Sequence, residues 1–183
     1  MTRVTMRLML GACLGWAAGV AGQTAPRPED VATPEAVVAA TYSSINREPG
    51  AHFDWDRFRS LHHPDARLAP MAEQRGGRND VLTVEEFITW LEEATAASAP
   101  IGSPADEGFY EEGIHAVVQR YGDIAQVMST YAKRFATGEE ILGRGINAFT
   151  LFWDGDRWWI LSIAWDEEAA AGPIPPRYLP GGR

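Results

Sequence analysis

Two turn signals in the second half of the chain limit its fold more than any other feature. They stand at Gly122-Asp123 and at Asp154-Gly155-Asp156, and each has the composition of a β-hairpin turn. The runs that flank them are rich in β-branched and aromatic residues and comprise residues 114–121, 124–135, 145–153 and 157–165. Four such runs joined in pairs predict an antiparallel meander.

Three helices are predicted in the first half, each from a capping residue: Thr33, Asp54 and Thr83. Pro34 follows the first cap at the opening helical position, and this helix should extend to about Asn46. Glu86 completes a capping box three residues after the third cap. Residues 66–71 are expected to add a short strand between the second and third helices.

The order helix, helix, short strand, helix and four-strand meander predicts an α+β fold with the helices on one face of the sheet. The chain has 183 residues, which is the length of about one domain. Its 45% hydrophobic and 22% charged residues are ordinary for a globular protein. A core can therefore form without disulfides or metals.

Residues 1–22 have the pattern of a cleavable signal peptide. Arg3 and Arg7 precede a short apolar run, and small residues allow cleavage after Ala21 or Gly22. We therefore expect a periplasmic or secreted protein. Two alternatives are an uncut N-terminal anchor and a lipoprotein modified at Cys13, although the apolar stretch before Cys13 is very short.

The remaining chain divides by composition. Residues 23–32 are polar and contain proline, which is typical of a linker. The domain is expected over residues 33–168, and a Pro/Gly-rich tail over residues 169–183. After cleavage we expect no stable membrane insertion.

Charge and cysteine content exclude several classes of function. The net charge of −9 makes nucleic acid a poor partner. The single cysteine, Cys13, lies in the leader, so the mature domain has no disulfide, thiolate metal site or cysteine nucleophile. Phosphate-loop, dinucleotide-binding and zinc-protease motifs are absent from the sequence, and we expect neither a metal nor a cofactor.

The order of these elements and several short stretches resemble the nuclear transport factor 2-like (SnoaL-like) superfamily. The stretches are residues 34–38, 54–58, 62–66, 144–147 and 158–160. The resemblance implies a curved antiparallel sheet wrapped around N-terminal helices, a cystatin-like cone with a central pocket. The superfamily includes isomerases, dehydratases, polyketide cyclases and epoxide hydrolases, and also binding and assembly domains, so the resemblance does not select a function.

Three residues are candidate acids or bases. His63 and Asp65 are two positions apart, as in a general base with its orienting carboxylate, although Pro64 interrupts the strand pattern. The alternative is a turn in which Asp65 makes a local hydrogen bond. His115 is the third candidate if its face of the strand lines the cone, and a packed or exposed histidine otherwise.

Five residues are candidate ligand contacts: Tyr42, Tyr131, Arg144, Asn147 and Trp165. The tyrosine hydroxyls would serve as donors, and the arginine would hold a carboxylate or an enolate. A two-residue turn at Asp154-Gly155 would place Arg144 opposite Trp165 in a cation–π contact. A shift of one residue would place Arg144 opposite Asp166 in a surface ion pair.

Both faces of the last hairpin carry large apolar residues. The helices can cover only one of these faces, so the apolar residues of the other face remain exposed. We expect a homodimer through this outer face, because a large exposed apolar patch usually marks an interface. The alternative is a monomer in which the Pro-rich tail, residues 172–178, covers that face.

Two functions fit these observations. The first is an exported binding or accessory domain whose apolar, cone-shaped pocket holds a small apolar or carboxylate-bearing molecule. The second is a cofactor-free lyase or isomerase that uses a histidine or aspartate as its general base in the same pocket. Whether the protein is an enzyme is left open by the sequence.

Overall fold

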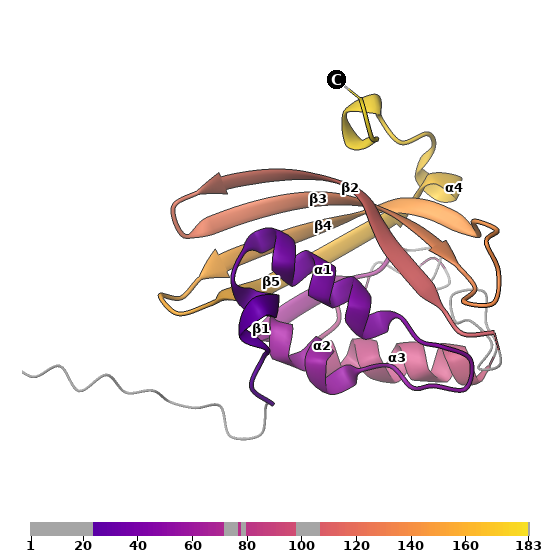
Figure 1. Ribbon diagram of the computed structural model, residues 1–183, viewed down its shortest axis with the longest axis horizontal. Helices are drawn as coiled ribbons and strands as arrows, with labels where there is room; N and C mark the ends of the chain where they lie inside the picture. The colour runs from indigo at the N-terminus through magenta and orange to yellow at the C-terminus, as the bar shows by residue number, and fades with distance from the viewer. Residues whose placement is uncertain (1–23, 72–76, 78–79, 98–106, 183) are drawn as a thin grey trace, which may run out of the picture.

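The structure is a computed structural model, and it describes residues 24–71, 77, 80–97 and 107–182. Four helices, two 3-10 turns and five strands occur there (Figure 1). In chain order they are η1 (Pro28–Val31), α1 (Pro34–Ile45), α2 (Trp55–Leu61), β1 (His62–Ala69), α3 (Val84–Ala96), β2 (Tyr110–Tyr121), β3 (Ile124–Arg134), β4 (Gly143–Trp153), β5 (Trp158–Glu167), α4 (Glu168–Ala171) and η3 (Pro176–Tyr178).

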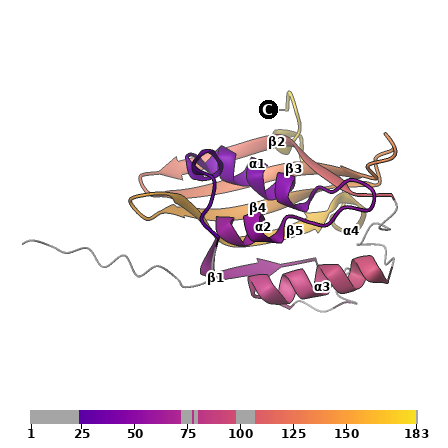
Figure 2. The same ribbon diagram turned by 60° about the horizontal axis from the view of Figure 1, so that its bottom comes forward.

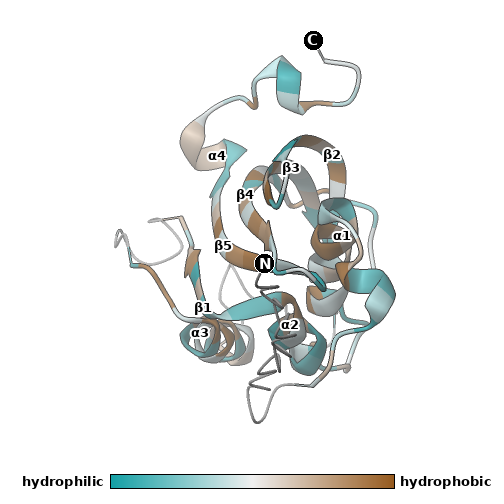
Figure 3. Ribbon diagram, turned by 90° about the vertical axis from the view of Figure 1, so that its left-hand side faces the viewer, coloured by the Kyte–Doolittle hydropathy of each residue, from teal (hydrophilic) through white to brown (hydrophobic). Residues whose placement is uncertain are grey.

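The five strands form one sheet in the order β1-β5-β4-β3-β2. The four strands of the meander are antiparallel, as predicted, and β1 joins its edge parallel to β5. The sheet is curved, with α1 on its concave side and the C-terminal tail on the other side (Figure 3). This architecture confirms the predicted α+β fold, in which a curved sheet wraps around N-terminal helices.

The three predicted caps begin their helices. The Thr33 hydroxyl accepts a hydrogen bond from the Ala36 N–H at 3.1 Å, and the Asp54 carboxylate accepts one from the Arg57 N–H at 3.1 Å. Thr83 and Glu86 form the reciprocal capping box. Each cap satisfies N–H groups that a helix leaves unpaired at its first turn.

The end of the expected linker contributes to the domain. Val31, in η1, is buried in the core. The neighbouring Asp30 is also buried and accepts two hydrogen bonds from the Arg57 guanidinium, at 2.7 and 2.8 Å. A bidentate arginine–carboxylate pair of this kind fixes the geometry of the segment on α2.

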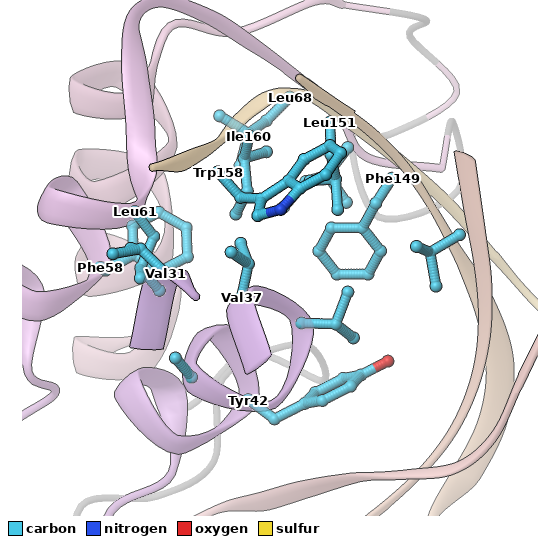
Figure 4. Close-up of a cluster of buried hydrophobic side chains, with 14 of the residues drawn as sticks. Val31, Val37, Tyr42, Phe58, Leu61, Leu68, Phe149, Leu151, Trp158 and Ile160 are labelled. Carbon is cyan, nitrogen blue, oxygen red and sulfur yellow. The ribbon is translucent and has the colours of Figure 1, made fainter. Parts of the chain in front are cut away.

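The core lies between α1, α2 and the concave face of the sheet (Figure 4). Val37 on α1 and Leu61 on α2 are fully buried against inward-facing strand residues. Those strand residues recur at every second position and include Leu68, Val127, Phe149, Leu151, Trp158 and Ile160. Helix α3 packs at the β1 edge (Figure 2).

The register of the last hairpin differs from both predicted alternatives. Trp153 pairs with Trp158 around a four-residue loop, in which the Asp154 carboxylate accepts hydrogen bonds from two backbone N–H groups. A bulge at Leu161 then adds an unpaired residue to β5, so that Gly145 pairs with Glu167. The prediction assumed a two-residue turn and a regular ladder, and the longer loop and the bulge invalidate both assumptions.

The bulge decides which face the end of β5 presents. Before it, Trp158 and Ile160 face the helices, and after it Ile163 and Trp165 do so. If Leu161 took part in a regular ladder in place of the bulge, the second pair would lie on the outer face. No helix in the described part of the chain is long and apolar enough to span a membrane.

Candidate ligand pocket

A pocket opens on the concave side of the sheet, between α1, α3 and the inner faces of β2 to β5. Its cavity volume is about 90 Å³. Most of its lining is apolar and comprises Ile45, Phe53, Phe58, Leu68, Phe87, Trp90, Leu91, Phe109, Phe149, Ile163 and Trp165. Phe87 and Trp165 meet edge to face, with ring centroids 5.7 Å apart.

The polar groups of the pocket converge at one end. The hydroxyls of Tyr42 and Ser129 are hydrogen-bonded at 2.7 Å. The side-chain amide of Asn147 donates to the Tyr42 hydroxyl at 3.2 Å and to the Glu111 carboxylate at 3.0 Å. One chain of hydrogen bonds therefore links α1 with β2, β3 and β4.

Three charged residues lie beside this chain. Glu111 and Lys133 are direct cross-strand partners on β2 and β3, and the Lys133 ammonium donates a hydrogen bond to Glu167 on β5. Lys133 pairs with Gly143 on β4, a residue without a side chain, and so reaches across that strand to β5. Lys133 is also the only lysine in the sequence.

The Glu111 carboxyl group is buried, and its polar partners stabilise its charged form only in part. Burial raises the pKa of its carboxyl to about 7, and the repulsion from Glu167 acts in the same direction. The hydrogen bond from Asn147 and the charge of Lys133 lower the pKa but do not offset the burial. Glu111 is therefore a carboxyl group that gains and loses its proton near neutral pH.

Burial also raises the pKa of Tyr42 and of Tyr131 well above the usual range of a phenol, and the charge of Glu111 adds to both shifts. Both hydroxyls therefore stay protonated at neutral pH and can donate hydrogen bonds. The Tyr131 hydroxyl lies close over Gly145, where an added Cβ would come within 2.5 Å of it. Gly145 thus makes room for this phenol.

Four of the predicted ligand contacts line the pocket: Tyr42, Tyr131, Asn147 and Trp165. They come from α1, β3, β4 and β5, and the first three lie at the polar end. A regular ladder would have put Asn147 and Trp165 on opposite faces, and the bulge in β5 brings them to the same one.

His63 and Asp65 do not line the pocket. The His63 ring contacts Phe152 and Trp159 edge-on, at 5.5 and 5.7 Å, and both of these residues face outward. The Asp65 N–H donates to the His63 ring nitrogen at 3.2 Å, and both residues lie in strand β1, not in a turn. The neighbouring His62 points inward instead, with its ring against the Phe58 ring and 2.7 Å from the Phe58 carbonyl oxygen.

His115 and Arg144 lie on the outer side of the sheet. His115 pairs with Thr130, whose hydroxyl donates to the Tyr178 carbonyl of the tail at 2.5 Å. Arg144 binds Glu168 on α4 through two guanidinium nitrogens, at 2.7 and 3.0 Å. The predicted contacts of Arg144 with Trp165 or Asp166 are wrong, because the loop and the bulge move those residues along β5.

Sequence reasoning missed Glu111, Lys133 and Glu167. Strand β2 was expected to begin at Ile114, which left Glu111 outside the sheet, and β5 was expected to end at Trp165. Of these three residues, Lys133 is the one that the sequence could have indicated, because it is the single lysine in a chain that otherwise uses arginine. Its parity with Val127 and Tyr131 also indicates the inner face.

No family model and no curated protein matches the chain. Solved structures do match it. A protein of unknown function with a cystatin-like fold from Nostoc punctiforme superposes with a TM-score of 0.56 at 12% identity, over 73% of this chain and 87% of that one. A protein of unknown function from Mycobacterium tuberculosis gives 0.53 at 16% identity, over 73% and 68%.

An NTF-2 like protein of unknown function from Silicibacter pomeroyi superposes with a TM-score of 0.50 at 19% identity, over 74% of this chain and 93% of that one. Identities this low establish a shared fold and leave the function undetermined. The fold is therefore that of nuclear transport factor 2-like proteins with a cystatin-like architecture.

Proposed function

With this fold as the frame, we propose that the domain binds a small, largely apolar and uncharged molecule in the inner pocket. One observation carries the proposal: the pocket walls are apolar, and its polar groups meet at a single end. Sites of this composition bind the apolar body of a ligand through the hydrophobic effect and orient it through a few hydrogen bonds.

The charge of the polar end favours an uncharged ligand. Glu111 and Glu167 face one ammonium group, that of Lys133, and the Arg144 guanidinium is bound to Glu168 outside the pocket. A carboxylate-bearing ligand would meet two carboxyl groups and would have to displace an existing ion pair. A hydroxyl or carbonyl group fits the Tyr42, Asn147 and Glu111 side chains better.

The cavity volume limits the size of the ligand. The cavity of about 90 Å³ is smaller than the roughly 150 Å³ that holds a benzene ring in an engineered protein. The ligand therefore has few heavy atoms, or part of it stays at the pocket mouth.

Native mass spectrometry of the mature domain, purified from the periplasm of its own host, tests this proposal. We expect a discrete bound mass on the wild-type protein and its loss from Leu91→Trp, which fills the pocket. Leu142→Trp is the matched control, because Leu142 is 44% exposed in a loop. Equal retention by both variants, or no bound mass on the wild-type protein, would contradict the proposal.

A second candidate function rests on Glu111. A carboxyl group with a pKa of about 7 beside an apolar wall suits general acid–base chemistry, and the Tyr42 hydroxyl can donate to a developing oxyanion. We infer a cofactor-free isomerase step, in which Glu111 takes a proton from a carbon next to a carbonyl group and returns it to another carbon of the resulting enolate. The predicted bases His63, Asp65 and His115 lie outside the pocket, so Glu111 takes their place in this hypothesis.

Deuterium exchange into a small enolisable ketone that the cavity can hold, acetone, followed by NMR, tests this activity. We expect exchange above the buffer rate with the wild-type protein and its loss in Glu111→Gln. Glu112→Gln is the control, because Glu112 is the adjacent, exposed glutamate. Exchange that persists in Glu111→Gln would exclude Glu111 as the base.

We also propose that the protein is exported and forms a homodimer. Export is supported by the leader pattern of residues 1–22, which lie outside the described residues. The dimer is supported by apolar groups on the outer face of the sheet, where Leu161 is 40% and Ile124 62% exposed. The tail meets this face at Thr130 and leaves these two residues exposed.

A further inference from the structure

A second hollow lies between α1 and the edge strand β2, behind the inner pocket. Its cavity volume is about 380 Å³, larger than that of the pocket. One stripe of α1 forms its wall, at Glu35, Val38, Ala39, Tyr42, Ser43 and Asn46. Small residues line the opposite side, at Gly113, Ala116 and Ser129, and the Tyr42 ring packs over Gly113, where an added Cβ would come within 2.9 Å of it. We call this space the α1–β2 groove.

The groove runs beside an open sheet edge. Strand β2 is the last strand of the sheet, and no described strand pairs with its outer edge beyond the start of the strand (Figure 1). An edge strand carries a row of backbone N–H and C=O groups that can pair with another chain. Residues 113–121 contain neither proline nor lysine, the residues that commonly block such pairing, although a bulge interrupts the ladder at Ile114.

The chain already uses the first part of this edge. Arg47 forms an antiparallel bridge with Phe109, with N–H···O distances of 2.8 and 2.9 Å. The Asn46 side chain then accepts a hydrogen bond from the Glu111 N–H at 2.7 Å. In the described part of the chain, backbone pairing at this edge is therefore limited to one residue, Phe109, directly before β2, and the outer edge of β2 beyond it is left to the groove.

The dimensions and charge of the groove specify its occupant. The stripe from Glu35 to Asn46 spans about 17 Å of helix, which is the length of about five residues of extended chain. Val38 and Val127 line the groove on its inner side and are buried, and the exposed Glu35 lies beside them on α1. Glu112 alternates with the inward-facing Glu111, so its carboxylate lies on the outer side of the same edge. Glu112 approaches Arg134 only to 3.8 Å, with a side chain 60% exposed.

We propose that the α1–β2 groove binds an extended peptide segment of another protein, in which apolar and basic residues alternate, by adding it as a strand to the edge of β2. The backbone of the segment pairs with β2 beyond Gly113. Successive side chains of the added strand point to opposite faces of the sheet, so its apolar side chains face α1 in the groove and its basic side chains lie beside Glu112 on the outer side. The net charge of −9 attracts such a segment from solution.

Fluorescence anisotropy with a labelled peptide of alternating valine and arginine, about seven residues long, tests the proposal. We expect saturable binding to the full mature protein. The same peptide with methyl groups on alternate backbone nitrogens should bind at least tenfold more weakly, and a valine–glutamate peptide should not bind. Equal affinity of the methylated peptide would show binding by charge alone and would overturn the proposal.

Two exposed helical alanines give a matched pair of variants. Ala39→Trp, on the α1 stripe, should fill the groove and weaken binding at least tenfold, whereas Ala96→Trp at the end of α3 should leave it unchanged. Circular dichroism confirms that both variants fold. Unchanged binding by Ala39→Trp would overturn the proposal.

Hydrogen exchange locates the peptide. The backbone amides of residues 116–120 should exchange more slowly with the valine–arginine peptide bound, and amides of β1 should not change. Protection confined to other elements would overturn the proposed site. Leu91→Trp, which fills the inner pocket, should keep its peptide affinity, so this site and the proposed pocket function can fail independently.

Discussion

At the residue scale, two buried ionisable side chains have opposite effects on stability. Burial raises the pKa of Glu111 from 4.5 to about 7, so the folded state binds its proton more tightly than the unfolded state does. Burial lowers the pKa of His62 from 6.5 to about 4, so the folded state binds that proton less tightly. Glu111 therefore makes the fold less stable as the pH rises from 4.5 to 7, and His62 makes it more stable as the pH rises from 4 to 6.5.

Between pH 4.5 and 6.5 these two effects oppose each other. Each changes the free energy of unfolding by up to about 1.4 kcal/mol per pH unit. We predict that Glu111→Gln removes one of them, so that the free energy of unfolding of this variant rises by about 2 kcal/mol across that interval. Urea unfolding at a series of pH values measures this. Glu112→Gln should keep the wild-type profile, and a Glu111→Gln profile equal to that of the wild type would contradict the assignment.

At the scale of elements, strand β4 depends on a glycine at a crowded position. A Cβ on Gly145 would come within 2.3 Å of the Asp166 carbonyl oxygen and 2.5 Å of the Tyr131 hydroxyl. We predict that Gly145→Ala lowers the free energy of unfolding by about 1–3 kcal/mol, since overpacking forces the strands apart. Gly138→Ala is the control, because nothing lies within 4 Å of its added Cβ. Equal stability of the two variants in urea would refute the prediction.

The bulge in β5 supports a second prediction at this scale. Ile160 and Ser162 pair with the adjacent residues Leu151 and Thr150, so deletion of Leu161 would leave a regular ladder with the later residues of β5 still on the same faces. One alanine inserted after Ser162 would instead turn Ile163 and Trp165 to the outer face. We expect the insertion to abolish cooperative thermal unfolding, because it removes these groups from the core and the pocket. Leu161→Ala, at a position 40% exposed, should cost less than about 1 kcal/mol. An insertion variant with a wild-type melting curve would show that the register of β5 does not set the inner face.

At the scale of the whole molecule, the exposed apolar residues of the outer sheet face support the proposed homodimer. We predict that the mature protein is a dimer in size-exclusion chromatography with light scattering, and that Leu161→Arg separates the subunits by burying a charge at the interface. Ile141→Arg, at a loop position 52% exposed, is the control and should remain dimeric. A wild-type monomer at high micromolar concentration would instead favour the alternative in which the tail suffices to cover this face.

The sequence by itself determined the local features of this protein. Thr33, Asp54 and Thr83 begin their helices as predicted, because a cap depends on contacts within a few residues. The glycine–aspartate turns and the β-branched and aromatic strand residues likewise predicted the meander. Trp165, by contrast, lies in the pocket because of the bulge in β5.

Only the tertiary structure decided how the strands meet. The four-residue loop after Trp153 and the bulge at Leu161 set the β4–β5 register, and with it the partner of Arg144. The extended start of β2 brought Glu111 beside Lys133. Register and strand length depend on long-range packing against α1 and the neighbouring strands, and a one-residue shift exchanges the two faces of a strand. The polar end of the pocket therefore could not be predicted from local sequence.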